Sequence, residues 1–264
     1  MSRVVIFSPS RFSLYTTTVA EMLRRRDVDV SAIVVMRLFN YRRFTSEFAR
    51  DGNRLLKKIW KKLILQEKAY ETTDIETIVS YRQERNIGYK NVDQFCKQWS
   101  VPSVYCDTLN DARVIDQLDH DQPDLVVFTG GGLIRKDVLQ RSGRGVVNCH
   151  MGILPRYRGM DVVEWPILEG EHDQVGATVH FMDTGVDTGD ILSIHKIEIR
   201  PGETVARLRA RFEPAMCEAI VNTTVDFLAG ELQRQPQRAD DGKQYFVMHP
   251  TLDRITQQKL ANRR

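Results

Sequence analysis

Two side chains suited to acid–base and hydrogen-bonding chemistry stand two residues apart in the sequence. Asn148 and His150 flank Cys149 and follow the apolar run 145–147, which is typical of a β-strand. Because alternate residues of a strand point to the same face, we expect Asn148 and His150 to converge on one point and Cys149 to face away. An amide can only exchange hydrogen bonds, whereas an imidazole titrates near neutral pH and can also move a proton.

A second polar cluster lies about thirty residues later, after the apolar run 175–182. In the segment 183–190, a glycine stands two residues after each of two aspartates, Asp183 and Asp187. This spacing predicts a tight loop that directs a carboxylate inward. A third feature is the glycine run 130–132, which permits either close backbone approach to a ligand or a tight turn.

Two familiar nucleotide-binding motifs are missing from the sequence. The first apolar run ends in Ser8-Pro9-Ser10-Arg11, without the GxGxxG pattern of dinucleotide binders, and the pattern GxxxxGK[ST] occurs nowhere. A dinucleotide-dependent oxidoreductase and a P-loop enzyme are therefore both disfavoured.

Apolar runs rich in β-branched residues, separated by helical patterns, supply the elements that would position these side chains. They cover residues 4–7, 28–36, 102–105, 125–128, 145–148, 175–182 and 191–199. Unbroken apolar runs are typical of strands covered on both faces. We therefore predict an α/β fold: a Rossmann-like, doubly wound, mostly parallel seven-stranded sheet with helices on both faces. Such sheets bind ligands beyond the carboxyl ends of their strands.

Two regions interrupt this alternation. A basic helical insertion is expected at about 37–90 within a catalytic domain over 1–200, and its part from Arg37 to Lys68 carries ten Lys and Arg against three Asp and Glu. The resulting local charge of +7 is compatible with a solvated helix face or with an anionic partner. Residues 201–264 are expected to form a helical extension and tail, with Thr204 as N-cap and a bend or break near Pro214.

The composition is that of a soluble globular protein. Hydrophobic residues make up 42% of the 264 residues and charged residues 28%. No apolar run approaches the roughly 18 residues that cross a bilayer, and the apolar start is too short for a signal peptide. The four cysteines show no pairable spacing, so we expect reduced thiols and a cytoplasmic protein.

Together these residues resemble the folate-dependent formyltransferases. The family pattern is Asn-x-His, a Leu-Pro loop with a following glycine, and Asp-x-Gly. It is matched here by Asn148, His150, Leu154-Pro155, Gly159 and 187–189, with a departure at Gly152, where many relatives carry serine. The resemblance implies the formyltransferase fold and transfer of a formyl group from 10-formyltetrahydrofolate to an amine, with no metal.

The resemblance also implies roles for three catalytic residues. Asn148 would donate its amide N–H to the oxyanion that develops when an amine attacks the formyl carbon. His150 would stabilise that oxyanion or relay the proton, and Asp187 would orient His150 or hold a water molecule. The thiol of Cys149 is expected to pack in the core rather than act as a nucleophile. For His180, a core position and a substrate contact are equally open.

The ligand sites follow from the same resemblance. The folate is expected against residues from two loops: Gly131, Gly132, Leu133, Ile134, Arg135, Asp183 and Gly185. Asp183 is expected to stabilise its loop rather than act as a second catalyst. The acceptor is expected near Ser10, Arg11, Arg156 and Arg158. For the last two arginines, contact with an anionic acceptor and simple exposure in a loop are both open.

The choice of acceptor rests on what surrounds the motifs. Only sixty residues follow Thr204, which disfavours a separate tRNA-binding domain. The glycine-rich phosphate loop of glycinamide ribonucleotide formyltransferases is not matched after the first strand. No regulatory domain is expected before Arg3, which disfavours a formyltetrahydrofolate hydrolase. We therefore expect a small-molecule amine acceptor, in the first place an amino sugar on a nucleotide.

Three further interpretations remain open. The first is an amino-acid amine such as N-hydroxyornithine as the acceptor. The second is a non-catalytic binding module with the same fold, and the third is a nucleic-acid binder that uses 37–68. The complete set of Asn148, His150 and Asp187 disfavours the binding module, and the basic segment lacks interleaved aromatic residues and any known nucleic-acid motif. No membrane partner is expected, and the chain could form a homodimer.

Overall fold

A seven-stranded sheet forms the centre of the protein. The computed structural model describes residues 1–37, 76–238 and 240–263, so most of the basic insertion lies outside the described residues. The strands are β1 (Arg3–Ser8), β2 (Asp29–Met36), β3 (Ser103–Cys106), β4 (Leu125–Phe128), β5 (Val146–His150), β7 (Gly176–Phe181) and β8 (Ile191–Lys196). Their order is β3-β2-β1-β4-β5-β7-β8. The strands from β3 to β5 are mutually parallel, whereas β7 is antiparallel to both β5 and β8.

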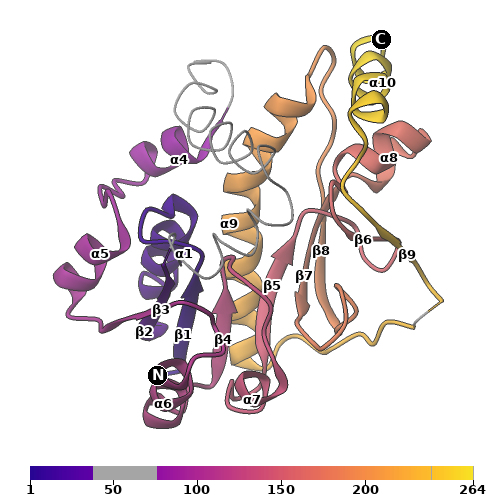
Figure 1. The fold of residues 1–264 in the computed structure, drawn as a ribbon. Helices are drawn as coiled ribbons and strands as arrows, with labels where there is room; N and C mark the ends of the chain where they lie inside the picture. The colour runs from indigo at the N-terminus through magenta and orange to yellow at the C-terminus, as the bar shows by residue number, and fades with distance from the viewer. Residues whose placement is uncertain (38–75, 239, 264) are drawn as a thin grey trace, which may run out of the picture.

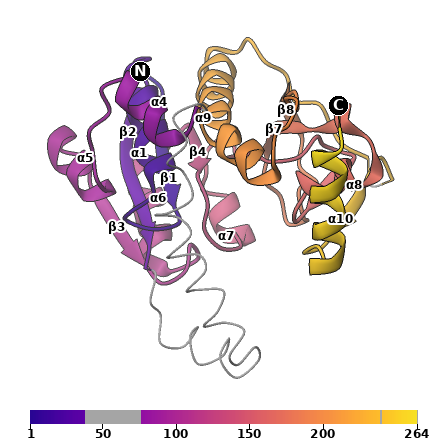
Figure 2. The ribbon, with the colours of Figure 1, turned by 90° about the horizontal axis from the view of Figure 1, so that it is seen from above.

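Helices cover both faces of this sheet (Figures 1 and 2). On one face lie α1 (Leu14–Arg24), α4 (Ile78–Glu84), α5 (Val92–Trp99) and α9 (Val205–Ala229), and on the other α6 (Ala112–Asp121) and α7 (Lys136–Leu139). Strand β1 shows why the apolar runs do not alternate: Val4 and Ile6 belong to the first core, and Val5 and Phe7 to the second. The predicted fold class is confirmed.

Helix α9 differs from the expectation at one point. It begins after Thr204, whose hydroxyl accepts a hydrogen bond from the amide of Arg207, as the N-cap prediction required. It then runs as one helix to Ala229 with Pro214 in its interior, so the helix is not broken at the proline. Phe212 and Cys217, on either side of the proline, are fully buried against the sheet, and this packing holds the helix together across the missing N–H.

The C-terminal part of the chain is more than an extension. A short strand, β9 (Lys243–Tyr245), pairs in parallel with β6 (Tyr157–Gly159), which lies in the loop after β5. Helix α10 (Pro250–Ala261) then packs on α8 (Glu164–Glu169), next to the 3-10 turn His172–Gln174 (Figure 1). The sequence does not predict the β6–β9 pair, because three-residue strands leave no periodic pattern.

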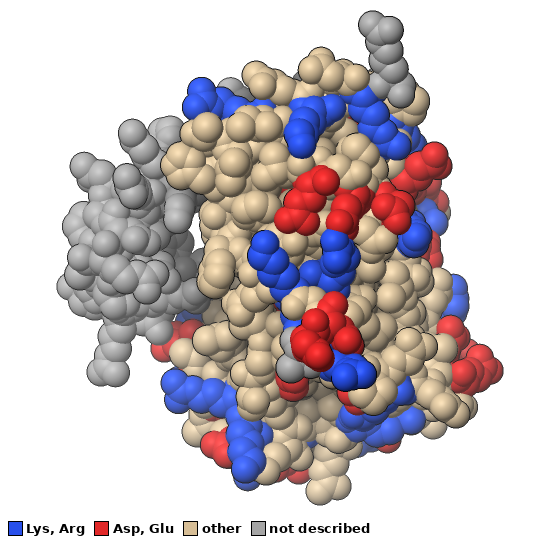
Figure 3. All heavy atoms as spheres, turned by 90° about the vertical axis from the view of Figure 1, so that its right-hand side faces the viewer, with Lys and Arg blue, Asp and Glu red and all other residues tan. Residues whose placement is uncertain are grey.

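The surface viewed in Figure 3 carries Lys and Arg interspersed with Asp and Glu. It therefore shows no patch of one sign of the kind that binds a nucleic-acid backbone. Among the described residues, no helix combines the length and the apolar character needed to span a bilayer. All four cysteines are buried and free.

Candidate active site

Strand β5 brings Asn148 and His150 to one face, at the carboxyl end of the parallel strands. Cys149 belongs to the opposite core, is 5% exposed, and its burial raises the pKa of the thiol well above the ordinary value. The alternation predicted from the sequence is therefore confirmed, and the thiol is not poised as a nucleophile. His150 is 8% exposed, so its ring is largely shielded from water.

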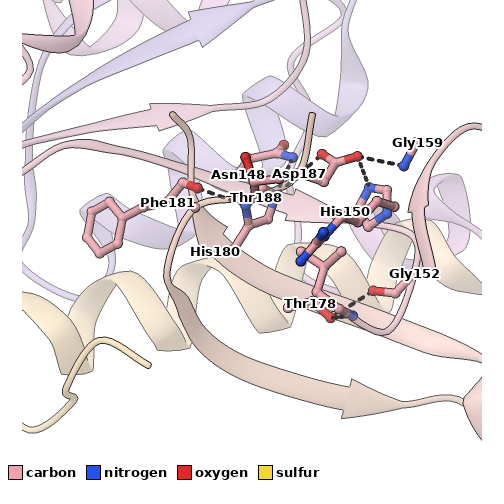
Figure 4. Close-up of polar contacts among 12 residues, drawn as sticks. Asn148, His150, Gly152, Gly159, Thr178, His180, Phe181, Asp187 and Thr188 are labelled. Atoms are coloured by element: carbon pink, nitrogen blue, oxygen red, sulfur yellow. Dashed lines mark hydrogen bonds and ion pairs between the residues drawn. The ribbon is translucent and has the colours of Figure 1, made fainter. Parts of the chain in front are cut away.

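Asp187 reaches the two residues from the loop between β7 and β8 (Figure 4). Its Oδ2 atom lies 3.6 Å from Nδ1 of His150 and accepts a hydrogen bond of 2.9 Å from the amide of Gly159. Its Oδ1 atom lies 3.7 Å from Nε2 of His180. The backbone of Asp187 is left-handed, with φ of 53°, a conformation that costs energy for a residue other than glycine. The structure thus brings together all three side chains predicted to be catalytic.

The second ring nitrogen of His150 is held by the loop that follows β5. Nε2 lies 3.0 Å from the carbonyl oxygen of Tyr157, which can only accept, so Nε2 carries a proton and Nδ1 is turned toward Asp187. Gly152 explains the close fit of this loop. A Cβ atom there would lie 2.8 Å from His150 Nε2 and 2.8 Å from the Tyr157 carbonyl oxygen. A side chain at position 152 would therefore require the ring or this carbonyl to shift.

Thr178 pins the same loop from strand β7. Its hydroxyl donates to the carbonyl of Gly152 over 2.7 Å and accepts from the amide of Leu154 over 3.0 Å. The side chain is completely buried, so these hydrogen bonds are shielded from water. Two buried hydrogen bonds thus fix the loop that carries Gly152 to strand β7.

The sequence allows either a core position or a substrate contact for His180, and the structure places it in the site beside Asn148 and Asp187. It lies on β7 directly opposite Asn148 on β5. Its Nδ1 lies 2.8 Å from the carbonyl oxygen of Phe181, so Nδ1 carries the proton and Nε2 accepts from the Asn148 amide over 3.2 Å (Figure 4). Burial, and then the nearby His150, lower the pKa of His180 to about 4. The neutral ring therefore orients the Asn148 amide and leaves its second N–H for a ligand.

The residues predicted to contact the folate lie in two loops, one that follows β4 and one between β7 and β8. Leu133 is 86% exposed, and its carbonyl accepts from the Asn110 side chain over 2.8 Å. The Asn110 side chain in turn accepts from the Arg135 amide over 2.7 Å, so one asparagine holds the loop after β4. Gly131 has a φ of 144°, which suits a residue without a side chain. Ile134 is buried in the core next to α7.

Asp183 holds its own loop in shape. Its carboxylate accepts from the Gly185 amide over 2.9 Å and from the Thr188 hydroxyl over 2.8 Å. These contacts agree with the loop-stabilising role expected from the sequence. They also close the loop that presents Asp187.

The residues predicted to contact the acceptor are engaged with other parts of the protein. Their partners are Asp93 for Arg11, Glu171 for Arg156, Gln237 for Arg158, and the amide of Phe12 for the hydroxyl of Ser10. Arg158 is also 5% exposed. The structure therefore gives these arginines structural partners, which the sequence alone could not reveal. Across residues 1–37, 76–238 and 240–263, no group of three or more His, Cys, Asp and Glu side chains is arranged to hold a metal ion.

Comparison with known proteins extends this description. A family model described as formyl transferase matches residues 67–224. A methionyl-tRNA formyltransferase of Alkaliphilus oremlandii is 28% identical over 157 residues, which cover 59% of this chain and 50% of that protein. The chain spans about half the length of the curated relatives it matches.

Solved structures share the fold at low sequence identity. Glycinamide ribonucleotide transformylase 1 from Symbiobacterium toebii is 17% identical with a TM-score of 0.59, over 90% of this chain and 95% of that one. A sugar N-formyltransferase from a Shewanella species is 12% identical with a TM-score of 0.59, over 98% and 88%. The matched family region contains β5, β7 and the loop of Asp187, where the site lies. The chain belongs to the formyl transferase family.

Proposed function

We propose that the protein is an N-formyltransferase that moves a formyl group from 10-formyltetrahydrofolate to the amine of a small-molecule acceptor. The observation that carries this proposal is the convergence of Asn148, His150 and Asp187 at the carboxyl edge of the sheet. Membership of the formyl transferase family supports the same reaction class. Four free, buried cysteines are compatible with a reducing, cytoplasmic location.

The side chains match the needs of acyl transfer to an amine. Attack of a neutral amine on a formyl carbon builds negative charge on oxygen and leaves a proton to be removed from nitrogen. Collapse of this intermediate breaks the bond between the formyl carbon and N10, and tetrahydrofolate leaves with a proton on that nitrogen. Asn148 has one N–H committed to His180, and its second N–H is available to the developing oxyanion. His150, held between Tyr157 and Asp187, is placed to stabilise that charge or pass on the proton.

The formyl donor would lie against the loop after β4 and the loop that carries Asp187. The loop after β4 leaves the carboxyl edge of the sheet, where folds of this class bind their ligands. The loop between β7 and β8 brings Asp187 within 3.6 Å of His150 at the end of β5. The exposed Leu133 offers apolar contact to a flat aromatic ring, and Gly131 and Gly132 allow backbone approach. The donor supplies the formyl group, and no metal is required by this chemistry.

For the acceptor, we propose an amino sugar carried on a nucleotide. The support is the local charge of +7 over Arg37 to Lys68, which would attract phosphates. The alternative acceptor is a hydroxylated amino acid such as N-hydroxyornithine. The alternative to an enzyme is a protein of the same fold that binds its ligand without catalysis.

The test is an acceptor screen with the purified protein and 10-formyltetrahydrofolate. Nucleotide-linked amino sugars, N-hydroxyornithine and glycinamide ribonucleotide are supplied separately. Folate absorbance and the mass of each acceptor are followed, with the variant Asn148→Ala as the matched control. Formylation of a nucleotide sugar by the wild type, much reduced in the variant, supports the proposal. Formylation of another amine corrects the acceptor. Folate binding without transfer to any amine in a wide panel would overturn the enzymatic assignment.

A further inference from the structure

The chain that follows α9 returns to the active site. We call residues 233–248 the C-terminal strap. Its backbone is attached at two places: Gln235 exchanges two hydrogen bonds of 2.8 Å with Ile191 at the start of β8, and β9 pairs with β6. Between these attachments, the side chain of Gln237 points toward the loop that presents Asp187.

Gln237 uses both ends of its amide. Its Nε2 donates to the carbonyl of Asp187 over 3.2 Å and to the carbonyl of Gly189 over 2.5 Å. Its Oε1 accepts from Arg158, over 3.3 Å from Nε and 3.1 Å from Nη2. Carbonyls only accept and a guanidinium only donates, so this position needs a side chain that carries a donor and an acceptor together.

Arg158 connects this amide to the catalytic pair. It is buried in β6, and the residues on either side of it are Tyr157, whose carbonyl faces His150, and Gly159, whose amide donates to the Asp187 carboxylate. Asp187 therefore accepts two hydrogen bonds: its carboxylate from the Gly159 amide and its backbone carbonyl from Gln237. Arg158 links the two donors, because it precedes Gly159 in the chain and donates to the Gln237 side chain.

The backbone of Asp187 shows why it needs such support. A left-handed conformation in a residue other than glycine persists only where the surroundings impose it. Gln237 donates hydrogen bonds to the backbone carbonyls of Asp187 and Gly189. At Gly189 the backbone is also tightly packed, because a Cβ atom there would lie 2.0 Å from the carbonyl oxygen of Phe181. The loop therefore has little room to rearrange while Gln237 holds it.

We propose that Gln237 is a positioning residue that, together with Arg158, sets Asp187 against His150 during the formyl transfer. This inference rests on the function proposed above. Gln237 contacts neither His150 nor the Asp187 carboxylate, so it acts through the loop and not on the reacting atoms. It follows that the side chain of Gln237 supports the loop of Asp187, although it lies outside the family-matched region 67–224.

The experiment compares Gln237→Glu, Gln237→Leu and Gln235→Ala with the wild type. Glutamate still accepts from Arg158 but cannot donate to the two carbonyls, whereas leucine removes both functions at similar size. Gln235 is the matched control, because its side chain is exposed and its contacts to Ile191 are made by the backbone. The measurements are kcat, both KM values, the pH profile of kcat, and the NMR signal and hydrogen exchange of the Gly159 amide in ligand-free protein.

We expect both Gln237 variants to lose about 10- to 100-fold in kcat with KM values within about threefold of wild type, since a displacement of about 1 Å can cost that much. Their kcat pH profile should change shape, and the Gly159 amide should exchange faster. Gln235→Ala should match the wild type in every measurement. If one Gln237 variant fails to fold, the other and Arg158→Lys provide the same readouts.

Two results would overturn the positioning role: wild-type kcat in a folded Gln237 variant, or a lower melting temperature with an unchanged pH profile and an unchanged Gly159 signal. If the wild type transfers formyl to no acceptor, the proposed function fails. The Gly159 signal then decides by itself whether Gln237 positions Asp187.

Discussion

The side-chain amide of Asn148 donates to Nε2 of His180 across the β5–β7 strand pair, over 3.2 Å. The opposite nitrogen of His180 is committed to the Phe181 carbonyl, so the ring can accept from Asn148 only while it is neutral. A buried histidine that stays unprotonated therefore determines which way the amide of a catalytic asparagine points. The first two predictions test this relationship from either end.

Replacing Asn148 with alanine should reduce kcat by about 10²–10³, the usual loss for one oxyanion donor. The melting temperature should change little, because the side chain is only partly buried. Steady-state kinetics with the acceptor found in the screen, together with thermal melting, check both points. A folded Asn148→Ala protein with wild-type turnover would remove Asn148 from the mechanism.

His180 should make the folded state less stable in acid. Its folded pKa of about 4 lies below the ordinary 6.5, so between these values the unfolded chain binds a proton that the folded protein does not. The free energy of unfolding should therefore fall as the pH drops from about 6.5 to about 4, by about 3 kcal/mol from this residue.

Denaturant unfolding of the wild type and of His180→Gln at several pH values measures this term. Glutamine can still accept from Asn148 but does not titrate, so the variant should lose stability less steeply over the same range. Equal slopes for the two proteins would mean that His180 is not held neutral by the fold.

Cys149→Ala should retain most of the activity and cost about 1 kcal/mol or more in stability, because it removes a buried atom from the core between the sheet and α9. The raised pKa of this buried thiol already argues against a thiolate nucleophile. Activity assays and denaturant unfolding on the same preparation test both halves. Complete loss of activity in a well-folded variant would restore Cys149 as a catalytic candidate.

Gly152→Ala should harm catalysis more than its small size suggests. The added methyl group would lie 2.8 Å from His150 Nε2, so either the ring or the Tyr157 carbonyl must move. We expect kcat to fall by about 10- to 100-fold, in line with the cost of a displaced catalytic group. Gly88→Ala is a useful comparison for the general effect of an added methyl at a glycine, since nothing lies within 4 Å of a Cβ there and its φ is not left-handed. Wild-type kcat in Gly152→Ala would show that this loop adapts freely.

The basic segment can be tested although it lies outside the described residues. Changing Lys57, Lys58, Lys61 and Lys62 together to glutamine should raise the acceptor KM several-fold and leave the folate KM unchanged. The reason is that each exposed charge contributes about a few tenths of a kcal/mol to the binding free energy of an anionic acceptor. The effect should shrink as salt reduces the Debye length from about 10 Å at 0.1 M to about 3 Å at 1 M. Unchanged acceptor kinetics at low salt would remove the reason for preferring a phosphate-bearing acceptor.

The arginines show where sequence reasoning stops. Arg11, Arg156 and Arg158 have the residue type expected for an anionic acceptor, but each is engaged with a partner from another part of the chain. No pattern in the sequence predicts a role for Gln237, because a single polar residue in a polar stretch is also typical of a solvent-exposed tail. Its role follows from the return of the strap to the site, which no local pattern encodes.

What the sequence determined by itself is local. The β-branched runs predicted the strands, strand alternation separated Asn148 and His150 from Cys149, and the Asp-x-Gly spacing predicted the loop of Asp187. What only the tertiary structure decided is which of these elements meet. The pairing of β5 with β7, which places His180 opposite Asn148, and the hold of Gln237 on Asp187 join residues about 30 and 50 positions apart. Such contacts depend on the register and topology of the whole sheet, because each polar group takes the partner that the surrounding packing places within reach.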